Sequence, residues 1–345
     1  MAVSRRRFLA TAGAAGAVFG VPEIVIAAPA RDKFTVAVGA EHALVYLAWD
    51  VAKALGYFER EGLDVNLIYT KGGTEAGLAL MSGNVDYSGN AIDHAIAAAD
   101  QGKSLVMISD FMDQPGISLL CKAENRSKFT NGGASFRGKT IGITSVGSAT
   151  DVLAHWIAHR AGVPNGDVKT VGVGGGSTVM AAIQSGQVDA AFANDPYATL
   201  LMKQGRAVSV ADMYTSAVTR QWLGFNNYCF TGALTRADVI QKNPERTQKV
   251  VNALVRALKF MQKSTPEQLA QALPDEFRGG ASVADWAASY AHSRPAYTAV
   301  GRISVDAVDN VIASNANFLG KTLSAKAGQL FDNSFTDRAA RTVKV

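Results

Sequence analysis

The chain has 345 residues, of which 48% are hydrophobic and 18% charged, a mixture typical of a globular protein rather than a disordered or fibrous one. Two cysteines are too few for a disulfide scaffold or an all-cysteine zinc site. The net charge of +5 is mild and no dense stripe of Lys and Arg concentrates it, which argues against a nucleic-acid partner.

The first thirty residues have the pattern of an export signal. Three arginines at 5–7 are followed by Phe8-Leu9, a weakly apolar run over 10–26 and small residues at 28–30. This order predicts a signal peptide over 1–30 that is cleaved near Ala30. The arginine pair before Phe-Leu resembles a twin-arginine signal, with an ordinary secretory signal as the alternative. We therefore expect an exported protein, located in a periplasm.

Short β-rich runs alternate with helical stretches from residue 31 onward. The first series is a strand at 34–38, a helix at 44–55, a strand at 65–69, a helix at 74–81, a strand at 85–88, a helix at 91–99 and a strand at 105–109. The second series is a strand at 139–143, a helix at 149–161, a strand at 168–173, a helix at 178–184, a strand at 188–192, a helix at 196–204 and a strand at 207–210. Such alternation predicts an α/β fold with mostly parallel sheets.

The two series are related in sequence. Residues 72–91 align without gaps on 175–194, and seven of the twenty positions are identical. Each copy contains a Gly-Gly turn, a helix, a Ser-Gly pair and a strand, in that order. The repeat predicts two similar lobes.

The chain changes character after residue 226. A strand-like run over 226–234 precedes helices predicted at 236–241, 245–263, 266–273, 283–293 and 304–318. Stretches 117–123 and 228–234 are predicted to cross between the lobes. The first lobe is then discontinuous, comprising residues 31–120 and 229–345, and residues 121–228 form the second.

Cys121 and Cys229 fall on the two predicted crossovers. If these strands are neighbours, the two residues can form a disulfide across the hinge. A twin-arginine substrate folds before export in a reducing compartment, so we favour two buried thiols.

Several motifs resemble one family of transport proteins. These are the segment 54–65 (ALGYFEREGLDV), the paired Ser-Gly-x-Val-Asp segments, and Gly-Lys-Thr-Ile-Gly at 138–142 leading to Gly147-Ser148. They resemble the solute-binding proteins of ABC importers, in the nitrate/sulfonate/taurine branch that also contains thiamine-pyrimidine binding proteins. The resemblance covers roughly residues 33–270. It implies a type II periplasmic binding protein fold, with two crossover strands and a ligand enclosed between the lobes.

Ligands of open α/β sheets bind beyond the carboxyl ends of the strands. Ser145, Ser148 and Thr150 follow the strand at 139–143, where a helix begins. Hydroxyls beside free helix N–H groups bind oxyanions without a full positive charge. The alternative is that Ser148 only caps the helix and Thr150 supports its first turn.

Other candidate ligand-binding residues follow the remaining strands or precede the return crossover: Glu41, His42, Asn90, Asp93, Asp195, Tyr197 and Phe225. Asp195 stands in Asn-Asp-Pro, where the family often has Trp-Glu-Pro, and it either meets a hydrogen-bond-donating ligand or caps the next helix. Acids outnumber bases near the predicted cleft. A zwitterion or a nitrogen heterocycle is therefore an alternative ligand to an oxyanion.

No catalytic constellation is evident. His155 and His159 have the spacing of two metal ligands on a helix, but no third ligand is evident, so we expect a core or surface pair and no metal. We predict a monomeric binding protein without cofactor or enzymatic activity, which closes by hinge motion and delivers a small polar solute to a membrane permease and its ATPase. The alternatives are a pyrimidine-forming enzyme relative, which would want a cofactor lysine and a cysteine cluster, and a sensor module.

Overall fold

The computed structural model describes residues 31–344, and the predicted signal peptide lies outside the described residues. Among the residues that the structure describes, no helix is both long enough and apolar enough to cross a membrane.

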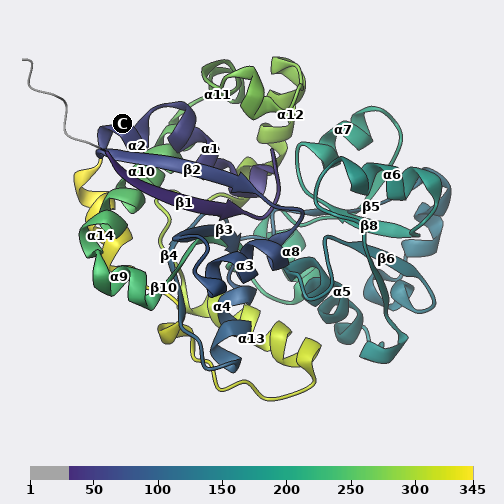
Figure 1. The fold of residues 1–345 in the computed structure, drawn as a ribbon. Helices are drawn as coiled ribbons and strands as arrows, with labels where there is room; N and C mark the ends of the chain where they lie inside the picture. The colour runs from purple at the N-terminus through teal and green to yellow at the C-terminus, as the bar shows by residue number, and fades with distance from the viewer. Residues whose placement is uncertain (1–30, 345) are drawn as a thin grey trace, which may run out of the picture. The chain divides into compact units, whose positions relative to one another are not determined.

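Five strands form the first sheet, in the order β2-β1-β3-β10-β4 (Figure 1). They are β1 (Asp32–Val38), β2 (Leu63–Tyr69), β3 (Tyr87–Ala91), β4 (Leu105–Asp110) and β10 (Thr231–Arg236). β1 pairs in parallel with β2 and β3, whereas β10 is antiparallel to β3 and β4. The helices α1 (Leu47–Ala54), α2 (Tyr57–Arg60), α3 (Gly73–Ser82), α4 (Asp93–Asp100), α9 (Ala237–Lys242) and α10 (Pro244–Lys263) belong with this sheet. We call this assembly the first lobe.

The second sheet repeats this plan, in the order β7-β6-β8-β5-β9. Its strands are β5 (Ser118–Cys121), β6 (Thr140–Ile143), β7 (Lys169–Gly172), β8 (Ala190–Ala193) and β9 (Val208–Asp212). β5 is the antiparallel member, pairing with β8 and β9. With α5 (Ala149–Arg160), α6 (Ser177–Ser185), α7 (Tyr197–Lys203) and α8 (Ser216–Leu223), this sheet forms the second lobe. The expected fold class, an α/β protein with two mostly parallel sheets flanked by helices, is confirmed.

Each of the two antiparallel strands pairs in the sheet opposite to that of the strand before it in the chain. β5 follows β4 of the first sheet but pairs in the second sheet, and β10 follows β9 but pairs in the first. β5 falls within the predicted stretch 117–123, whereas β10 overlaps the predicted stretch 228–234 and continues to Arg236. Cys121 ends β5 of the second sheet, whereas Cys229 precedes β10 and its Sγ lies 3.6 Å from Met107 Sδ of the first sheet, so each is a buried free thiol.

The sequence repeat has a structural role in both lobes. The backbone N–H of Asp86 donates to the carbonyl of Thr35, and the Asp86 carboxylate accepts the N–H of Thr35 at 3.0 Å. Asp189 makes the same reciprocal pair with Thr140, with 2.9 Å between its Oδ2 and the Thr140 nitrogen. Each aspartate therefore links one strand, at Thr35 in the middle of β1 or at Thr140 at the start of β6, to the turn before a neighbouring strand.

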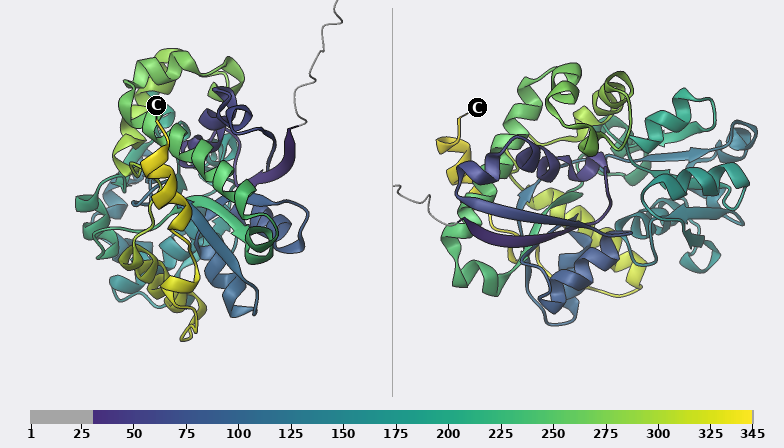
Figure 2. Two further views of the ribbon diagram at one scale, coloured as in Figure 1. Left: turned by 90° about the vertical axis from the view of Figure 1, so that its left-hand side faces the viewer. Right: turned by 45° about the horizontal axis from the view of Figure 1, so that its top comes forward.

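Further helices follow α10 along the chain (Figure 2). They are α11 (Pro266–Ala272), α12 (Val283–Ser293), α13 (Val305–Leu319) and α14 (Ser334–Thr342). α14, which was not predicted, packs against α10, whereas α12 contacts α7 and α13 contacts both α4 and α5. α12 and α13 therefore connect the two lobes. The short 3-10 turns are η1 (Leu44–Tyr46), η2 (Ala123–Phe129), η3 (Gly132–Phe136), η4 (Asn165–Asp167), η5 (Asp275–Arg278), η6 (Arg294–Ala296) and η7 (Ala327–Gln329).

The third strand of the first series, β3, lies later in the chain than predicted. The strand expected at 85–88 lies at 87–91, because its polar residues are buried in the sheet and interrupt the apolar pattern. Ser88 donates its hydroxyl to the carbonyl of Ala37, and Asn90 is also buried. The buried polar side chains of β3 make hydrogen bonds to distant parts of the chain, which a local sequence pattern does not reveal.

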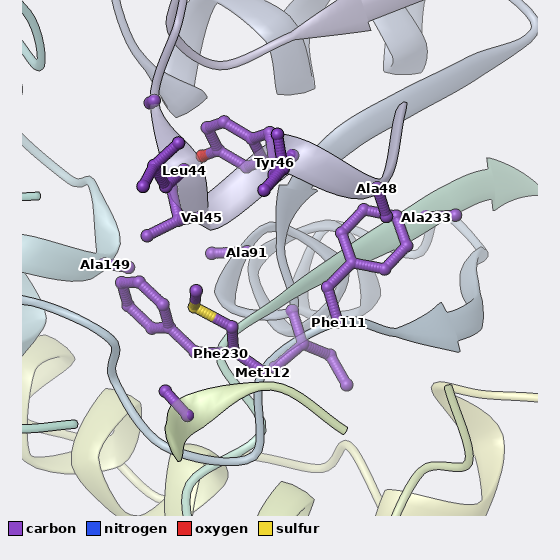
Figure 3. Packing of buried hydrophobic residues seen from close by; sticks show 14 of the residues in the cluster. Leu44, Val45, Tyr46, Ala48, Ala91, Phe111, Met112, Ala149, Phe230 and Ala233 are labelled. Atoms are coloured by element: carbon purple, nitrogen blue, oxygen red, sulfur yellow. The ribbon is translucent and has the colours of Figure 1, made fainter. Parts of the chain in front are cut away.

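A continuous hydrophobic core joins the lobes. It includes residues of η1 and β1 from the first lobe and residues of β6 and α5 from the second. In Figure 3, Phe230 lies beside Ala149, the first residue of α5. A separate, smaller cluster lies entirely within the second lobe.

Candidate functional site

A small cavity lies where the two lobes meet, and we call it the inner cavity. Its volume is about 30 Å³, roughly that of one water molecule in the liquid. Its walls are Gly39, Ala40, Val45, Tyr46, Gly73, Asn90, Ala91, His94, Ile117, Thr144, Ser148, Ala149, Thr150, Asn194 and Phe230. Residues of both lobes line this cavity, so the structure shows the lobes closed upon each other.

Three hydroxyl residues of the second lobe line this cavity. The Thr144 hydroxyl donates to Ser148 Oγ at 2.8 Å, and the Thr150 hydroxyl lies 2.9 Å from Ser148 Oγ and accepts the Thr144 N–H. Ser148 precedes α5, but its side chain makes no capping hydrogen bond to that helix. The hydroxyl triad Thr144/Ser148/Thr150 is therefore joined mainly to itself, beside the N-terminus of a helix of twelve residues.

The first lobe contributes Asn90 and His94. The Asn90 amide donates to the carbonyl of Gly73 and accepts the N–H of Ala91, both at 2.9 Å, which leaves one N–H and one oxygen lone pair of the amide available. His94 is buried, and its Nε2 has no hydrogen-bond partner. Burial lowers the pKa of His94 to about 4, so the imidazole is neutral at pH 7. His94 thus offers an uncharged ring nitrogen to whatever the cavity binds.

α3 carries a glycine where His94 and Asn90 approach it. A Cβ on Gly73 would lie 2.6 Å from Asn90 Oδ1 and 2.9 Å from His94 Nε2, closer than real side-chain contacts. The close approach of these two side chains therefore requires a residue without a side chain at position 73.

The remaining polar group is Asn194, at the end of β8, whose Oδ1 is buried and without a partner. Tyr46 and Phe230 add aromatic surface, and burial together with the charge of nearby Asp93 raises the pKa of Tyr46, so its phenol stays protonated. No Lys, Arg, Asp or Glu occurs among the residues described as lining the cavity. The inner cavity is therefore uncharged and rich in hydrogen-bonding groups.

A larger cavity of about 780 Å³ opens outside the inner one, and we call it the mouth. Ala40 and Thr144 line both cavities. Between the lobes, Thr74 Oγ1 and Ser145 Oγ are 3.0 Å apart. A ligand that reaches the inner cavity from the mouth passes this contact, so we expect the pair to separate on opening.

The structure divides the ten predicted site residues among three places. Asn90, Ser148 and Thr150 line the inner cavity, and Glu41, Ser145 and Tyr197 line the mouth. The other four, His42, Asp93, Asp195 and Phe225, line neither cavity. Of the residues that line the inner cavity, Tyr46, His94 and Phe230 carry no motif that the sequence analysis used.

The four predicted residues outside both cavities contact other protein side chains or backbone groups. Asp93 is buried, accepts a hydrogen bond from Asn315 at 2.8 Å, and has its pKa raised by burial to about 6. Asp195 is fully buried, and its Oδ1 accepts the N–H of Thr199, which agrees with the helix-capping alternative. His42 lies 3.6 Å from Glu41, and Phe225 stacks on Trp156.

His155 and His159 are also not brought to a common ligand. His155 Nδ1 lies 3.4 Å from Asp151 Oδ1, and the ring of His159 packs against Trp156. Within residues 31–344, no cluster of three His, Cys, Asp or Glu side chains has the arrangement of a metal site.

Comparison with known proteins identifies the family. Residues 40–268 match the model of the NMT1/THI5 like family. The chain belongs to this family. A curated relative, the 4-amino-5-hydroxymethyl-2-methylpyrimidine phosphate synthase THI13 of Saccharomyces cerevisiae, is 25% identical over 235 residues, which cover 67% of each chain.

Solved structures support the fold. A protein of Bordetella bronchiseptica RB50 is 26% identical with a TM-score of 0.83, and the match covers 90% of this chain and 98% of that one. The periplasmic nitrate-binding protein NrtA of Synechocystis PCC 6803 has a TM-score of 0.73 at 13% identity, with 91% and 90% covered. The alkanesulfonate-binding protein SsuA of Xanthomonas axonopodis pv. citri, bound to MOPS, has a TM-score of 0.66 at 18% identity, with 90% and 99% covered. The resemblance stated from the sequence motifs is thereby confirmed.

Proposed function

We propose that this protein is the periplasmic substrate-binding component of an ABC importer and captures a small polar solute of the nitrate, sulfonate or taurine class. The observation that carries the proposal is the enclosed, uncharged cavity between the lobes, with the hydroxyl triad beside the N-terminus of α5. Helix N–H groups and hydroxyls stabilise an oxyanion without a counter-ion. The unpartnered Nε2 of buried His94 adds a further group for a ligand to engage.

The proposed mechanism is hinge closure. We infer lobes at residues 31–120 with 229–345 and at 121–228, except that β5 (Ser118–Cys121) pairs in the second sheet and so moves the first boundary to just before Ser118. Opening would let a solute enter the inner cavity, and closing on the solute would leave this cavity larger than the water-sized space seen here. The closed form would then meet a membrane permease and its ATPase, after export with removal of a signal peptide near Ala30. A receptor in place of the permease would make the same protein a sensor.

The second candidate ligand is a neutral nitrogen heterocycle such as a pyrimidine. Asn194 Oδ1 is a buried acceptor and His94 Nε2 a buried ring nitrogen, and neither has a partner. A heterocycle with adjacent donor and acceptor atoms satisfies both groups, whereas a nitrate supplies only acceptors. We favour binding over pyrimidine synthesis, because no lysine is among the residues described around the inner cavity and the two thiols lie in different parts of the fold.

A thermal-shift panel on the full chain tests these proposals. It contains nitrate, taurine and other sulfonates, carboxylates, and pyrimidines. A ligand at 100 times its dissociation constant stabilises the protein by about 2.7 kcal/mol, which raises the midpoint by roughly 5 °C. We expect Ser148→Ala to reduce the shift with oxyanions, and His94→Phe to reduce the shift with heterocycles. The matched control Ser185→Ala lies at the end of α6 and should leave both shifts unchanged.

The pattern of shifts decides between the candidates. A shift with sulfonates or nitrate that Ser148→Ala removes supports the oxyanion proposal. A shift confined to pyrimidines would indicate that the ligand binds mainly through His94 and Asn194. If none of the compounds shifts the unfolding midpoint, the proposed ligand classes are contradicted.

A further inference from the structure

A helix from the C-terminal part of the chain fastens the first lobe to the second. α12 is anchored to the first lobe, because the Tyr290 hydroxyl donates to the carbonyl of Met261 in α10 at 2.8 Å. On the other side α12 packs against α7 of the second lobe. Two of its side chains reach across. Asp285 pairs with Lys203, and His292, seven residues later, reaches Asp195.

His292 lies between two carboxylates of the second lobe. Its Nδ1 is 2.9 Å from Asp195 Oδ2, and its Nε2 is 3.9 Å from Asp212 Oδ1. Asp195 is fully buried, and its other oxygen already accepts two hydrogen bonds from Thr199. The ring of Tyr214 covers the imidazole, with 4.3 Å between the ring centroids. The imidazole therefore joins a carboxylate that the second lobe buries to a helix anchored on the first.

This contact adjoins the inner cavity. Asp195 directly follows Asn194, which lines that cavity, and the carbonyl of Asp195 accepts the N–H of Leu44 from the first lobe at 2.8 Å. Separating the lobes at this edge therefore breaks the His292–Asp195 and Leu44–Asp195 hydrogen bonds together.

The protonated imidazole fits this position better than the neutral one. A neutral ring that donates from Nδ1 to Asp195 has an unprotonated Nε2, and this nitrogen then faces the Asp212 carboxylate with a lone pair. A protonated ring presents an N–H toward each carboxylate and places a positive charge between two negative ones, and nearby opposite charges favour the charged form. The ring of Tyr214 is tilted by 48° against the imidazole.

We propose that His292 is a proton-operated clasp that favours the closed arrangement of the two lobes in mildly acidic solution. This inference rests on the proposed function only in assuming that the lobes open and close.

The direction of the pH dependence follows from linkage. Burial by itself lowers the pKa of His292, but the hydrogen bond to Asp195 and the charges of Asp195 and Asp212 outweigh it, so the pKa is raised in the closed form. In an open form without these partners, the imidazole has its ordinary pKa of about 6.5. The closed form thus binds more protons, and closure becomes more favourable as the pH falls through the raised pKa and levels off below the ordinary one.

The charged and titratable groups around this imidazole are few. α7 and the turn before it bring Asp195 and Lys203, β9 brings Asp212, and the turn after β9 brings Tyr214. α12 itself carries Asp285, which is paired with Lys203. Elsewhere between the lobes His155 of α5 packs on Phe318 of α13, and its pKa is also raised, so the test must isolate His292.

The test measures the distance between the lobes without any ligand. Spin labels are attached to Glu75→Cys and Ser177→Cys in the full chain, since both residues are exposed and line the mouth from different lobes. The native thiols are buried and should not react. Pulsed electron–electron double resonance measures the distance between the two labels. We expect the population at the shorter distance to rise about twofold or more when the pH is lowered from about 8.5 to about 5.5.

Variants assign the effect to the clasp. His292→Gln keeps a hydrogen-bond donor but does not titrate, so the rise with falling pH should disappear. Asp212→Asn should reduce the rise without abolishing it. His159→Gln, at an exposed histidine of α5, is the matched control and should behave as wild type. Equal midpoints of thermal unfolding at pH 8.5 would show that His292→Gln is folded.

Two outcomes would overturn the clasp: distances in the wild-type chain that do not depend on pH, or a pH dependence that His292→Gln retains. Either result leaves the solute-binding proposal intact, because no solute is present in the measurement. Conversely, a failed ligand panel leaves this distance measurement valid.

Discussion

At the scale of single residues, the site combines groups that are satisfied with groups that are not. Asn90 is held in place by hydrogen bonds to the backbone of Gly73 and Ala91, and one N–H and one lone pair of its amide remain for a ligand. His94 Nε2 and Asn194 Oδ1 are buried without partners. An unpaired buried polar atom costs about 1–3 kcal/mol. A bound solute that pairs with both atoms relieves this cost, which makes them the groups most informative about ligand chemistry.

The absence of a side chain at Gly73 yields a prediction at this scale. In Gly73→Ala the added methyl group would collide with Asn90 Oδ1 and His94 Nε2. We expect loss of at least about 1 kcal/mol of stability from overpacking, and at least about tenfold weaker binding of whichever solute the panel identifies, because both side chains must move. Denaturant unfolding and calorimetric titration measure the two effects.

The control is Gly166→Ala in η4, where an added methyl group meets no atom within 4 Å. It should change neither stability nor affinity appreciably. Unchanged affinity in Gly73→Ala would mean that the ligand does not depend on the positions of Asn90 and His94.

At the scale of elements, the repeated Ser-Gly-x-Val-Asp segment turns out to be architectural. In both copies the glycine ends a helix with a positive φ, at +82° for Gly83 and +76° for Gly186. In both copies the aspartate then makes a reciprocal pair with one residue of a neighbouring strand. The segment that most clearly reveals the duplication therefore reports the fold and carries no information about the ligand.

This assignment predicts the effect of removing each aspartate. Asp86→Ala and Asp189→Ala each leave one strand N–H without its acceptor, and each should lower the free energy of unfolding by about 1–3 kcal/mol. Asp86→Asn and Asp189→Asn should cost less, because an amide oxygen still accepts. Denaturant unfolding measures these losses, while solute affinity in the ligand panel should stay at its wild-type value. A large loss of affinity without loss of stability would contradict the architectural role.

The elements also show what a sequence pattern can and cannot predict. The two series of strands and helices, the crossover stretches and the family were predictable, because apolar periodicity, glycine punctuation and the repeat all act locally. Ser148 and Thr150 were predictable because they follow a strand end, whereas Asn90 was predicted as following a strand that in fact contains it. His94 lies on a helix, and it enters the cavity only because Gly73 of another helix makes room for it. Asp195 follows a strand end as expected, but it pairs with His292, nearly a hundred residues away in sequence.

At the scale of the whole molecule, the lobes share a core although their sheets are separate. The main hydrophobic cluster contains Val36 and Val38 of β1 together with Ile141 and Ile143 of β6. The second lobe retains only a small cluster of its own, around Val179 and Leu201. A lobe that depends on its neighbour for buried apolar surface has less stability by itself. The closed molecule should therefore unfold as one unit.

We accordingly expect a single calorimetric transition, with equal calorimetric and van't Hoff enthalpies. Phe230→Ala is the most direct test of the shared core, because this buried residue lies beside Ala149 of the other lobe (Figure 3). Truncating a buried Phe costs about 3–5 kcal/mol, so the whole transition should move to lower temperature without splitting. Phe331→Ala, on a half-buried residue remote in sequence from both crossovers, is the comparison and should cost less. Two separate transitions in the wild-type chain would show that each lobe is stable alone. A transition that splits only in Phe230→Ala would show that this one side chain couples the lobes.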